Sequence, residues 1–476
     1  MTPREVAPAR RAAFAVLLRE TRSRAPFDLA AATGVEFARL AARDRALAYE
    51  LAMGTIKRRN SLDRVVAAFS DASSSRLRPE VRESLRLGAF QLLYLDRVPA
   101  HAAVNDAVEL AKAHGRRTGA FVNAVLRKVA SEGRAELARL SGGASIEALA
   151  VRCSHPDWLV SLWVDELGRD AAEALMEADN RPAERCVRVN RLRATIAQAQ
   201  ASLSGDGITA RLAREAYAEV APDTPDALLL EGPALESSAA FREGLVMPQS
   251  RGSQLAAAIA AGALEPGARR GPARAADLCA APGGKTSQLA ALLAGWRLLA
   301  VDDEPRRVAA LRANLTRLGA ADVEVCERDV LEMGADEAER GRYGVVLLDA
   351  PCSGLGTLAS RPDLRWRRRA GDVRRLATLQ RDLLAAAAAL VAPGGALTYS
   401  VCTLTRAETL GVVDRFVAGR AREGAADSGS RTAWTLDDLG AAYPTYRHPA
   451  NGAYVQTLPS RDETTGFFVA RLRRVT

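Results

Sequence analysis

The chain is poor in lysine, in histidine and in closely spaced cysteines. Of its 66 lysines and arginines only four are lysine: Lys57, Lys112, Lys128 and Lys285. The six cysteines include no C-x-x-C pair, and the four histidines lack metal-ligand spacing. These absences argue against a zinc site and a disulfide framework, so we expect no bound metal. Because lysine is rare here, Lys285 in a glycine-rich turn suggests a specific need for a compact ammonium group.

Long apolar runs are also missing. The longest, residues 383–392, is too short to cross a bilayer. The charged N-terminal residues do not resemble a secretory signal. We expect a cytoplasmic protein without membrane contact, and we take it to be a monomer of two or three domains. A net charge of +9 favours a polyanionic partner, although an arginine-rich composition alone would also produce it.

Apolar periodicity divides the chain into three regions. Residues 1–140 repeat apolar side chains at helical spacing, as in Val81–Leu92 behind the helix-starting Pro79. Ser141-Gly142-Gly143 is typical of a linker. Residues 141–243 mix helix-like and strand-like stretches, which predicts a small α+β segment. Residues 244–476 alternate strands with helices, which predicts an α/β domain with a parallel sheet.

The most informative stretch is Asp277–Thr286, with the sequence DLCAAPGGKT. An apolar strand ending at Leu278 gives way to Pro282-Gly283-Gly284, and a helix begins at Lys285. A strand, a glycine-rich turn and a helix form the first unit of a nucleotide-binding α/β sheet. The glycines let the backbone approach a ligand, and the helix N-terminus favours a negative group. The ending also imitates a P-loop, but that pattern requires glycine where the chain has Cys279.

Polar residues follow each later strand of this region. Asp302 ends the second strand, Asp329 follows the third, Asp349 and Cys352 follow the fourth, and Cys402 follows the fifth. Ligands of open α/β sheets bind at the carboxyl ends of the strands, so we expect one site lined by these side chains. A single acid would more simply cap a helix or a turn. Three acids at successive strand ends favour a binding site.

Three stretches resemble the signatures of the RNA cytosine-C5 methyltransferases, the Sun family: residues 277–286, 349–354 and 399–403. The resemblance extends from Gly244 to the C-terminus. Residues 99–106 and 121–123 resemble the NusB-type helical RNA-binding domain. It implies a multidomain protein, with an all-α NusB-like domain over 1–140, a small α+β RNA-binding segment over 141–243, and a Rossmann-like class I methyltransferase domain over 244–476.

The resemblance also implies roles for individual residues. It assigns attack on the base to Cys402, product release to Cys352 and an acid role near the base to Asp349. The residues alone leave open which cysteine attacks, or whether both are merely buried. The cofactor implied is S-adenosyl-L-methionine, held by Cys279, Ala280, Ala281, Pro282, Gly283, Gly284, Lys285, Asp302, Asp329 and Asp349.

A basic stretch follows the fourth strand and contains Arg361, Arg365, Trp366 and Arg367. Arginines bind phosphates and an aromatic ring can stack on a base, so we expect these four residues to bind RNA. A target base must leave its stack to reach Cys402, which makes a basic loop there useful. A solvated loop without such a role is the alternative. Four positions depart from the family pattern: Val401 for Thr, Ser250 for Asp, Leu410 for Glu and Thr465 for Asp.

These patterns predict an enzyme that methylates carbon 5 of a cytosine in small-subunit (16S) ribosomal RNA. Only the NusB-like region favours ribosomal RNA, since the same catalytic signatures serve enzymes that act on tRNA. A non-catalytic RNA-binding or antitermination factor is the alternative from another class. The intact Cys402, Cys352 and Asp349 argue against it.

Overall fold

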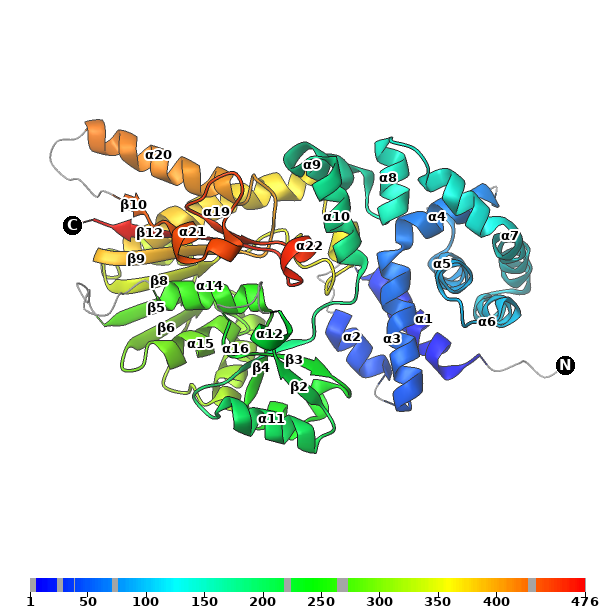
Figure 1. The fold of residues 1–476 in the computed structure, drawn as a ribbon, viewed down its shortest axis with the longest axis horizontal. Coiled ribbons are helices and arrows are strands. Elements are labelled where there is room, and N and C mark those ends of the chain that lie inside the picture. Colours follow the sequence, from blue (N-terminus) through cyan, green and yellow to red (C-terminus); the bar gives the residue numbers. More distant parts are fainter. Residues whose placement is uncertain are drawn as a thin grey trace. The chain divides into compact units, whose positions relative to one another are not determined.

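The computed structural model describes residues 6–23, 29–37, 39–70, 76–217, 224–262, 273–426 and 434–475. The chain divides into two compact units (Figure 1). The helical unit contains residues 1–181 and 358–369, and the sheet unit contains residues 182–357 and 370–476. This division differs from the boundary predicted at residue 140, because the helices after the glycine linker pack against the preceding bundle.

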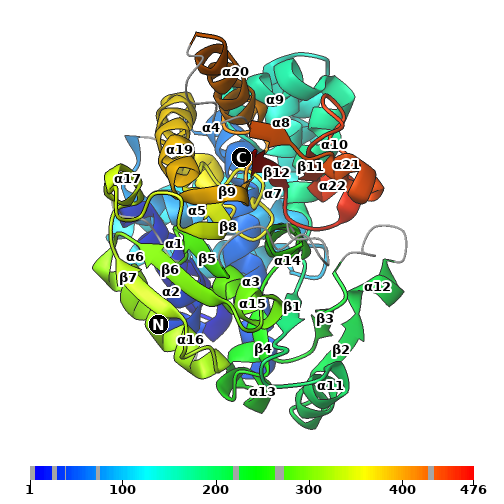
Figure 2. The ribbon, with the colours of Figure 1, turned by 90° about the vertical axis from the view of Figure 1, so that its left-hand side faces the viewer.

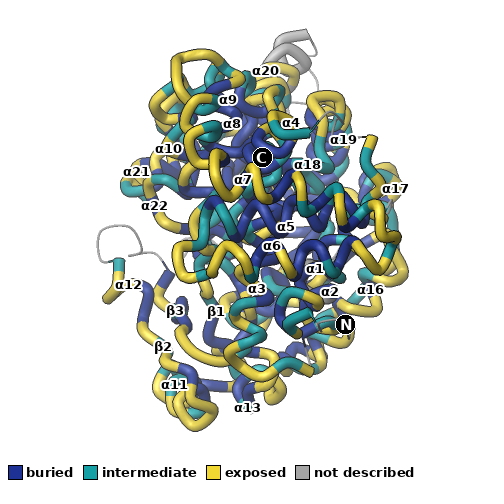
Figure 3. Tube along the Cα trace, turned by 90° about the vertical axis from the view of Figure 1, so that its right-hand side faces the viewer, coloured by how far each residue is buried: buried dark blue, intermediate teal, exposed yellow. Residues whose placement is uncertain are grey.

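The helical unit is all-helical, as predicted for the N-terminal region. Pro8 and Pro79 occupy the first turns of α1 and α5, where a missing N–H costs nothing. Helix α5 is buried along most of its length, whereas α7 keeps a long exposed face (Figure 3). Its helices are α1 (Pro8–Arg22), α2 (Leu29–Phe37), α3 (Ala42–Lys57), α4 (Arg59–Ala68), α5 (Pro79–Tyr94), α6 (Ala100–Lys112), α7 (Arg116–Ser141), α8 (Ile146–Cys153), α9 (Asp157–Leu167), α10 (Arg169–Asn180) and α18 (Leu364–Arg367).

The segment of residues 358–369 belongs to the helical unit although it lies far along the chain. It carries α18, and Trp366 packs against the apolar core formed mainly by α1, α3, α5 and α6. The indole Nε1 of Trp366 donates a hydrogen bond to the carbonyl of Ile56 at 2.8 Å. The helical unit is therefore discontinuous in sequence.

The sheet unit begins with a small antiparallel sheet in the strand order β2-β3-β1-β4. Val187, Leu203 and Leu228 contribute to its own apolar core. Helix α11 begins at a capping box between Thr195 and Gln198, which satisfies two backbone donors. The elements are β1 (Cys186–Val189), α11 (Ile196–Gly205), β2 (Thr209–Leu212), α12 (Ala213–Ala216), β3 (Ala227–Glu231), α13 (Ala239–Arg242) and β4 (Val246–Pro248).

An eight-stranded sheet forms the rest of this unit, in the order β10-β12-β9-β8-β5-β6-β7 with β11 paired to β12. Strands β5 to β9 are parallel, and β12 runs antiparallel to β9. The strands are β5 (Arg274–Leu278), β6 (Arg297–Asp302), β7 (Glu324–Glu327), β8 (Tyr343–Asp349), β9 (Val391–Val401), β10 (Trp434–Leu436), β11 (Val455–Thr457) and β12 (Phe467–Arg474).

Helices cover both faces of this sheet. Figure 2 shows α14 and α15 on one face and α17 and α19 on the other. No helix among the described ranges is both long and apolar enough to cross a bilayer. The helices are α14 (Arg251–Ala261), α15 (Gly284–Leu292), α16 (Pro305–Leu318), α17 (Val330–Ala335), α19 (Ala370–Leu390), α20 (Leu410–Ala426), α21 (Leu439–Ala442) and α22 (Pro459–Asp462).

The chain reverses its direction across the sheet beside β5. It runs outward from β5 through β6 to β7, and then returns to place β8 on the other side of β5. Ligands of doubly wound sheets bind at such a reversal, at the carboxyl ends of the strands. Cys279 follows β5 and Asp349 ends β8, so both stand at this reversal. The predicted Rossmann-like architecture is confirmed.

Candidate active site

The turn between β5 and α15 contains two residues in left-handed conformation, Cys279 with φ 60° and Gly283 with φ 99°. A Cβ on Gly283 would lie 2.9 Å from Leu311 Cδ1, so both conformation and space require glycine there. The backbone N–H of Ala281 donates to Asp302 Oδ2 at 3.1 Å. This bond ties the turn, residues 279–285, to the end of β6, where the cofactor site was predicted.

The acids predicted at strand ends have different partners. Asp302 is 2% exposed and also pairs with Arg307 at 3.1 Å. Asp329 Oδ1 accepts the backbone N–H of Leu331 at 2.7 Å and so caps α17. The simple helix-cap role considered for a single acid therefore exists at Asp329. It occupies one oxygen of a carboxylate that still lies at the end of β7.

Lys285 and Asp349 form an ion pair at the reversal. Lys285 Nζ donates to Asp349 Oδ2 at 2.8 Å, and Ser400 Oγ donates to Asp349 Oδ1 at 2.8 Å. Lys285 Nζ also lies 4.9 Å from the ring centroid of Phe467. Burial opposes the charge of Lys285, but the Asp349 carboxylate outweighs it and raises the pKa of the lysine. The ammonium is thus present, and the carboxylate has a fixed orientation.

Cys352 and Cys402 meet at the ends of the adjacent parallel strands β8 and β9, with 3.4 Å between their sulfur atoms. The hydrogen bond with Cys352 lowers the pKa of Cys402, against the effects of burial and of the Asp349 charge and with a smaller contribution from the Lys285 charge. The same hydrogen bond, together with burial, raises the pKa of Cys352. The pair therefore favours a thiolate on Cys402, the cysteine that the resemblance names as the nucleophile.

Arg188 and Gln249 support the turn from the small sheet, and sequence reasoning missed both. Arg188 is 1% exposed. Its guanidinium donates to Ser287 Oγ at 2.7 Å, to the Gly284 carbonyl at 3.3 Å and to Gln249 Oε1 at 2.8 Å. An arginine between two valines on a buried strand was the available signal. A third missed residue is the buried Glu408, which is hydrogen-bonded to the residues that follow both cysteines.

The predicted RNA-binding residues do not lie together on a surface. Arg365 is 0% exposed, and its guanidinium donates to the carbonyls of Lys57 and Ser154 and to Asn180 Oδ1 at 2.9 Å. Trp366 is bonded to Ile56 and Arg367 to the Glu20 carbonyl at 3.0 Å.

The structure therefore does not place Arg365 where RNA could reach it. Its hydrogen-bond partners lie far away in sequence, and the sequence therefore predicted an RNA-binding loop, with a solvated loop as the alternative. Arg361, whose side chain is 45% exposed and pairs with Asp363 at 3.5 Å, is accessible.

The four departures from the family pattern are accommodated locally. Val401 is fully buried in the apolar core, so the absent hydroxyl leaves no unpaired group. Thr465 Oγ1 donates to Ser250 Oγ at 2.6 Å, so the two residues that stand in place of aspartates are hydrogen-bonded to each other. Leu410 is 8% exposed and packs in the same core as Val401.

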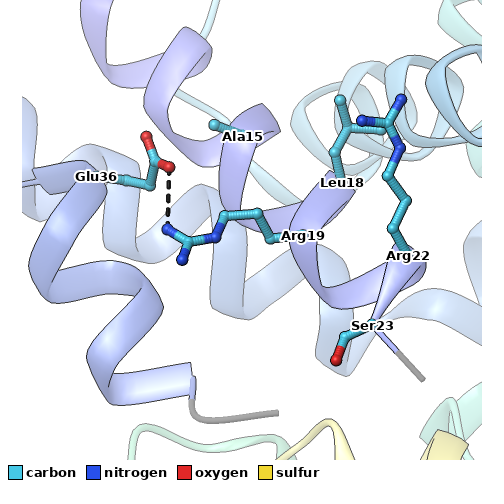
Figure 4. Close-up of a pocket in the computed structure, with 6 residues that line it drawn as sticks. All are labelled: Ala15, Leu18, Arg19, Arg22, Ser23 and Glu36. Atoms are coloured by element: carbon cyan, nitrogen blue, oxygen red, sulfur yellow. Dashed lines mark hydrogen bonds and ion pairs between the residues drawn. The ribbon is translucent and has the colours of Figure 1, made fainter. Parts of the chain in front are cut away.

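A cavity of about 550 Å³ lies in the helical unit. Figure 4 shows Arg19 pointing toward Glu36, with 3.2 Å between the paired atoms. The cavity contains none of the predicted site residues. No group of three metal-ligating side chains occurs in the part of the chain that the structure describes. The residues lining the cavity are Ala15, Leu18, Arg19, Arg22, Ser23 and Glu36.

Comparison with known protein families gives three matches along the chain. Residues 267–473 match the family described as 16S rRNA methyltransferase RsmB/F. Residues 7–131 match the NusB family, and residues 155–235 match the RsmF/B-like ferredoxin-like domain. The order of these matches is that of the three predicted regions.

Similar proteins match over most of their length. A Mycobacterium tuberculosis protein named as a methyltransferase is 35% identical over 100% of both chains. Ribosomal RNA small subunit methyltransferase B of Cronobacter sakazakii is 30% identical over 90% of both chains. The crystal structure titled PH0851 shares the fold, with a TM-score of 0.80 at 23% identity and 99% coverage of both chains.

Proposed function

Because this chain belongs to the 16S rRNA methyltransferase RsmB/F family, we propose that it methylates carbon 5 of a cytosine in small-subunit ribosomal RNA through a covalent cysteine intermediate. The observation that carries this proposal is the Cys352–Cys402 pair, 3.4 Å apart at the ends of β8 and β9. A methyltransferase that acts on a nitrogen or an oxygen has no need of two thiols at its reacting centre. A cytosine carbon does need a nucleophile there.

Carbon 5 of cytosine is a poor nucleophile. Attack of the Cys402 thiolate on carbon 6 consumes the 5,6 double bond and turns carbon 5 into the reactive carbon of an enamine. Bound S-adenosyl-L-methionine supplies an electrophilic methyl group. Transfer of the carbon-5 proton to water and elimination of the Cys402 thiolate from carbon 6 then restore the double bond. Cys402 thus begins and ends the cycle as a thiolate.

Neighbouring side chains have separate roles in this cycle. The Lys285 ammonium stabilises the Cys402 thiolate electrostatically. Ser400 and Lys285 orient the Asp349 carboxylate, which can accept a hydrogen bond from the amino group beside N3 of the base. The Cys352 thiol contacts the Cys402 sulfur, so it is placed to assist departure of that sulfur from carbon 6.

The residues at the strand ends have the chemistry that S-adenosyl-L-methionine requires. Carboxylates accept hydrogen bonds from ribose hydroxyls and from an adenine amino group, and Asp302 and Asp329 end or follow neighbouring strands. Gly283 leaves the turn free of a side chain that would collide with Leu311. We therefore assign the cofactor to residues 279–285 together with Asp302, Asp329 and Asp349.

The RNA-binding role falls to the helical unit and to Arg361. The NusB match and the exposed basic residues of α7, among them Arg116, Arg117 and Lys128, support RNA binding by this unit. We propose that the enzyme acts as a monomer in the cytoplasm and requires no metal ion.

A transfer assay tests the proposal. Purified protein, methyl-labelled S-adenosyl-L-methionine and deproteinised small-subunit ribosomal RNA should give labelled RNA, and base-resolved bisulfite sequencing should locate the methyl group on a cytosine. Transfer RNA in a parallel reaction tests the alternative substrate. Label that appears only on tRNA would overturn the substrate assignment. Label on another base or atom would overturn the chemistry.

Substitution of each cysteine separates their roles. Cys402→Ala should abolish transfer and form no covalent adduct. Cys352→Ala should accumulate an enzyme–RNA adduct that survives denaturing electrophoresis and disappears on nuclease digestion. The double variant, with both Cys352→Ala and Cys402→Ala, should form no adduct. An adduct seen with Cys402→Ala alone would reverse the assignment of the two cysteines.

A further inference from the structure

The buried carboxylate of Glu408 lies between the two loops that carry the cysteines. It is 0% exposed. From the β8 loop it accepts the Ser353 backbone N–H at 2.8 Å and the Ser353 hydroxyl at 2.6 Å. From the β9 loop it accepts the hydroxyls of Thr403 at 3.3 Å and Thr405 at 2.9 Å. Ser353 directly follows Cys352, and Thr403 directly follows Cys402.

Gln380 on α19 extends this network to the other side of Cys352. Its Nε2 donates to Glu408 Oε1 at 3.0 Å and to the Pro351 carbonyl at 2.9 Å. Helix α19 packs against β8 and β9 (Figure 2), so Gln380 is anchored on the same sheet. The residues on both sides of Cys352 are therefore held by one carboxylate, either directly or through Gln380.

We propose that Glu408 is a positioning residue that sets the separation of the Cys352 and Cys402 sulfur atoms. The consequence for catalysis rests on the proposed function. A buried carboxylate with neutral donors on both loops fixes their spacing, because moving either loop would leave a charge without hydrogen bonds. Attack on the base needs only Cys402. Release needs both sulfurs in contact, so loosening this network should slow release more than attack.

The first test uses oxidative cross-linking, which requires neither RNA nor cofactor. Diamide takes two hydrogen atoms from a pair of thiols and leaves a disulfide, so its rate of cross-linking reports sulfur–sulfur proximity. Cross-linking of Cys352 to Cys402, followed by peptide mass, should be at least tenfold slower in Glu408→Gln than in wild type. Thr405 also donates to the Glu408 carboxylate, but it is not adjacent to a cysteine in the sequence. The rate of cross-linking in Thr405→Val should therefore stay within twofold of the wild-type rate.

The second test measures the lifetime of the enzyme–RNA adduct in a single turnover. Glu408→Gln should form the adduct but release it at least tenfold more slowly, while its melting temperature and its cofactor affinity remain close to wild type. Unchanged cross-linking and unchanged adduct lifetime in folded Glu408→Gln would overturn the proposal.

If Glu408→Gln does not fold, Ser353→Ala takes its place. It removes one hydroxyl donor and leaves the buried charge, and it should slow both processes severalfold. Absence of an RNA adduct in both the wild-type protein and Cys352→Ala, with turnover retained, would refute covalent catalysis and leave the cross-linking result to decide the role of Glu408.

Discussion

Each unit of the molecule contains a fully buried carboxylate, and the two differ in the hydrogen bonds they accept. Glu408 in the sheet unit accepts hydrogen bonds from Ser353, Thr403, Thr405 and Gln380. Neither carboxylate oxygen of Asp179 in the helical unit accepts a hydrogen bond from any described residue. Burial raises the pKa of Asp179 to about 7, although the charge of Arg365 opposes this.

The difference shows two ways of using buried charge. Donors on both loops fix Glu408, and fully satisfied networks of this kind rigidify a site. The helical unit instead gathers charges that compensate one another without fixed donors at Asp179. These are Arg365 and Lys57, whose pKa burial lowers to about 8. The buried His155, whose Nε2 lies 3.6 Å from Asp179 Oδ2, adds no charge because burial lowers its pKa. The hydrogen bonds to Glu408 fix the positions of two loops. The charges around Asp179 instead make the stability of the helical unit depend on which groups are ionised.

The largest effect on stability is expected when the buried cation Arg365 is removed from the helical unit. Arg365→Ala should lower the free energy of unfolding by about 3–5 kcal/mol, because Asp179 and several buried carbonyls lose their cation and donor. Arg361→Ala, at a half-exposed pair, should cost less than about 1 kcal/mol. Urea unfolding of the two variants measures the difference. Equal losses would contradict a structural role for Arg365.

Substitution of Lys285 should lower activity rather than stability. Lys285→Met leaves the partly buried Asp349 unpaired, and we expect kcat/KM to fall about 100- to 1000-fold, or roughly 3–4 kcal/mol. Lys112→Met breaks an exposed pair with Glu109 and should leave kcat/KM within about twofold. Steady-state kinetics with labelled cofactor distinguish the two variants. A fall in kcat/KM of less than tenfold in Lys285→Met would show that the Lys285–Asp349 ion pair is not needed for methyl transfer.

Asp302 offers a smaller, selective effect at the same sheet edge. Asp302→Ala should weaken cofactor binding by about 1.5–3 kcal/mol, roughly 10- to 100-fold, because a charged acceptor of hydrogen bonds is lost. The adjacent, exposed Asp303→Ala is the matched control. Calorimetric titration with cofactor and a separate RNA-binding titration should show a change only in the former. Unchanged cofactor affinity would remove Asp302 from the site.

The charge balance around Asp179 predicts a modest pH dependence. Its folded pKa of about 7 exceeds the ordinary 3.8, so the folded protein keeps a proton that the unfolded chain has lost. The stability this group contributes is therefore present at low pH and lost as pH rises toward 7. Between about pH 5.5 and pH 7, wild type should lose up to about 2 kcal/mol relative to Asp179→Asn. The exposed Asp170→Asn on the same helix should show no such difference in urea unfolding.

The sequence predicted the parts of the site that depend on strand order. Polar residues after apolar strands, such as Asp302, Asp349 and Cys402, mark the carboxyl edge because parallel strands share that edge. The Thr405-x-x-Glu408 pattern also carried a signal, but by itself it predicts a capping box at a helix start. Its role between the cysteines depends on Ser353 and Gln380, which only the fold brings near.

Burial of the basic stretch could not be predicted in this way. Arg365 and Trp366 have their partners at Ile56, Ser154 and Asn180, which lie 310, 211 and 185 residues away in the sequence. Composition around them indicates a solvated loop, because arginine is seldom buried without a partner. No local pattern reveals a partner so distant. The same distance hid the assignment of residues 358–369 to the helical unit.

Discontinuity of the helical unit has a consequence during synthesis of the chain. Its helices α1–α10 leave the ribosome first, but Arg365 and Trp366 follow only after residues 182–357 have been translated, on the order of 10–40 s later at typical elongation rates. In that interval the carbonyls of Ile56 and Ser154 lack the donors they have in the finished protein. The first unit to be translated is thus completed only when β8, the strand before Cys352, has already been made.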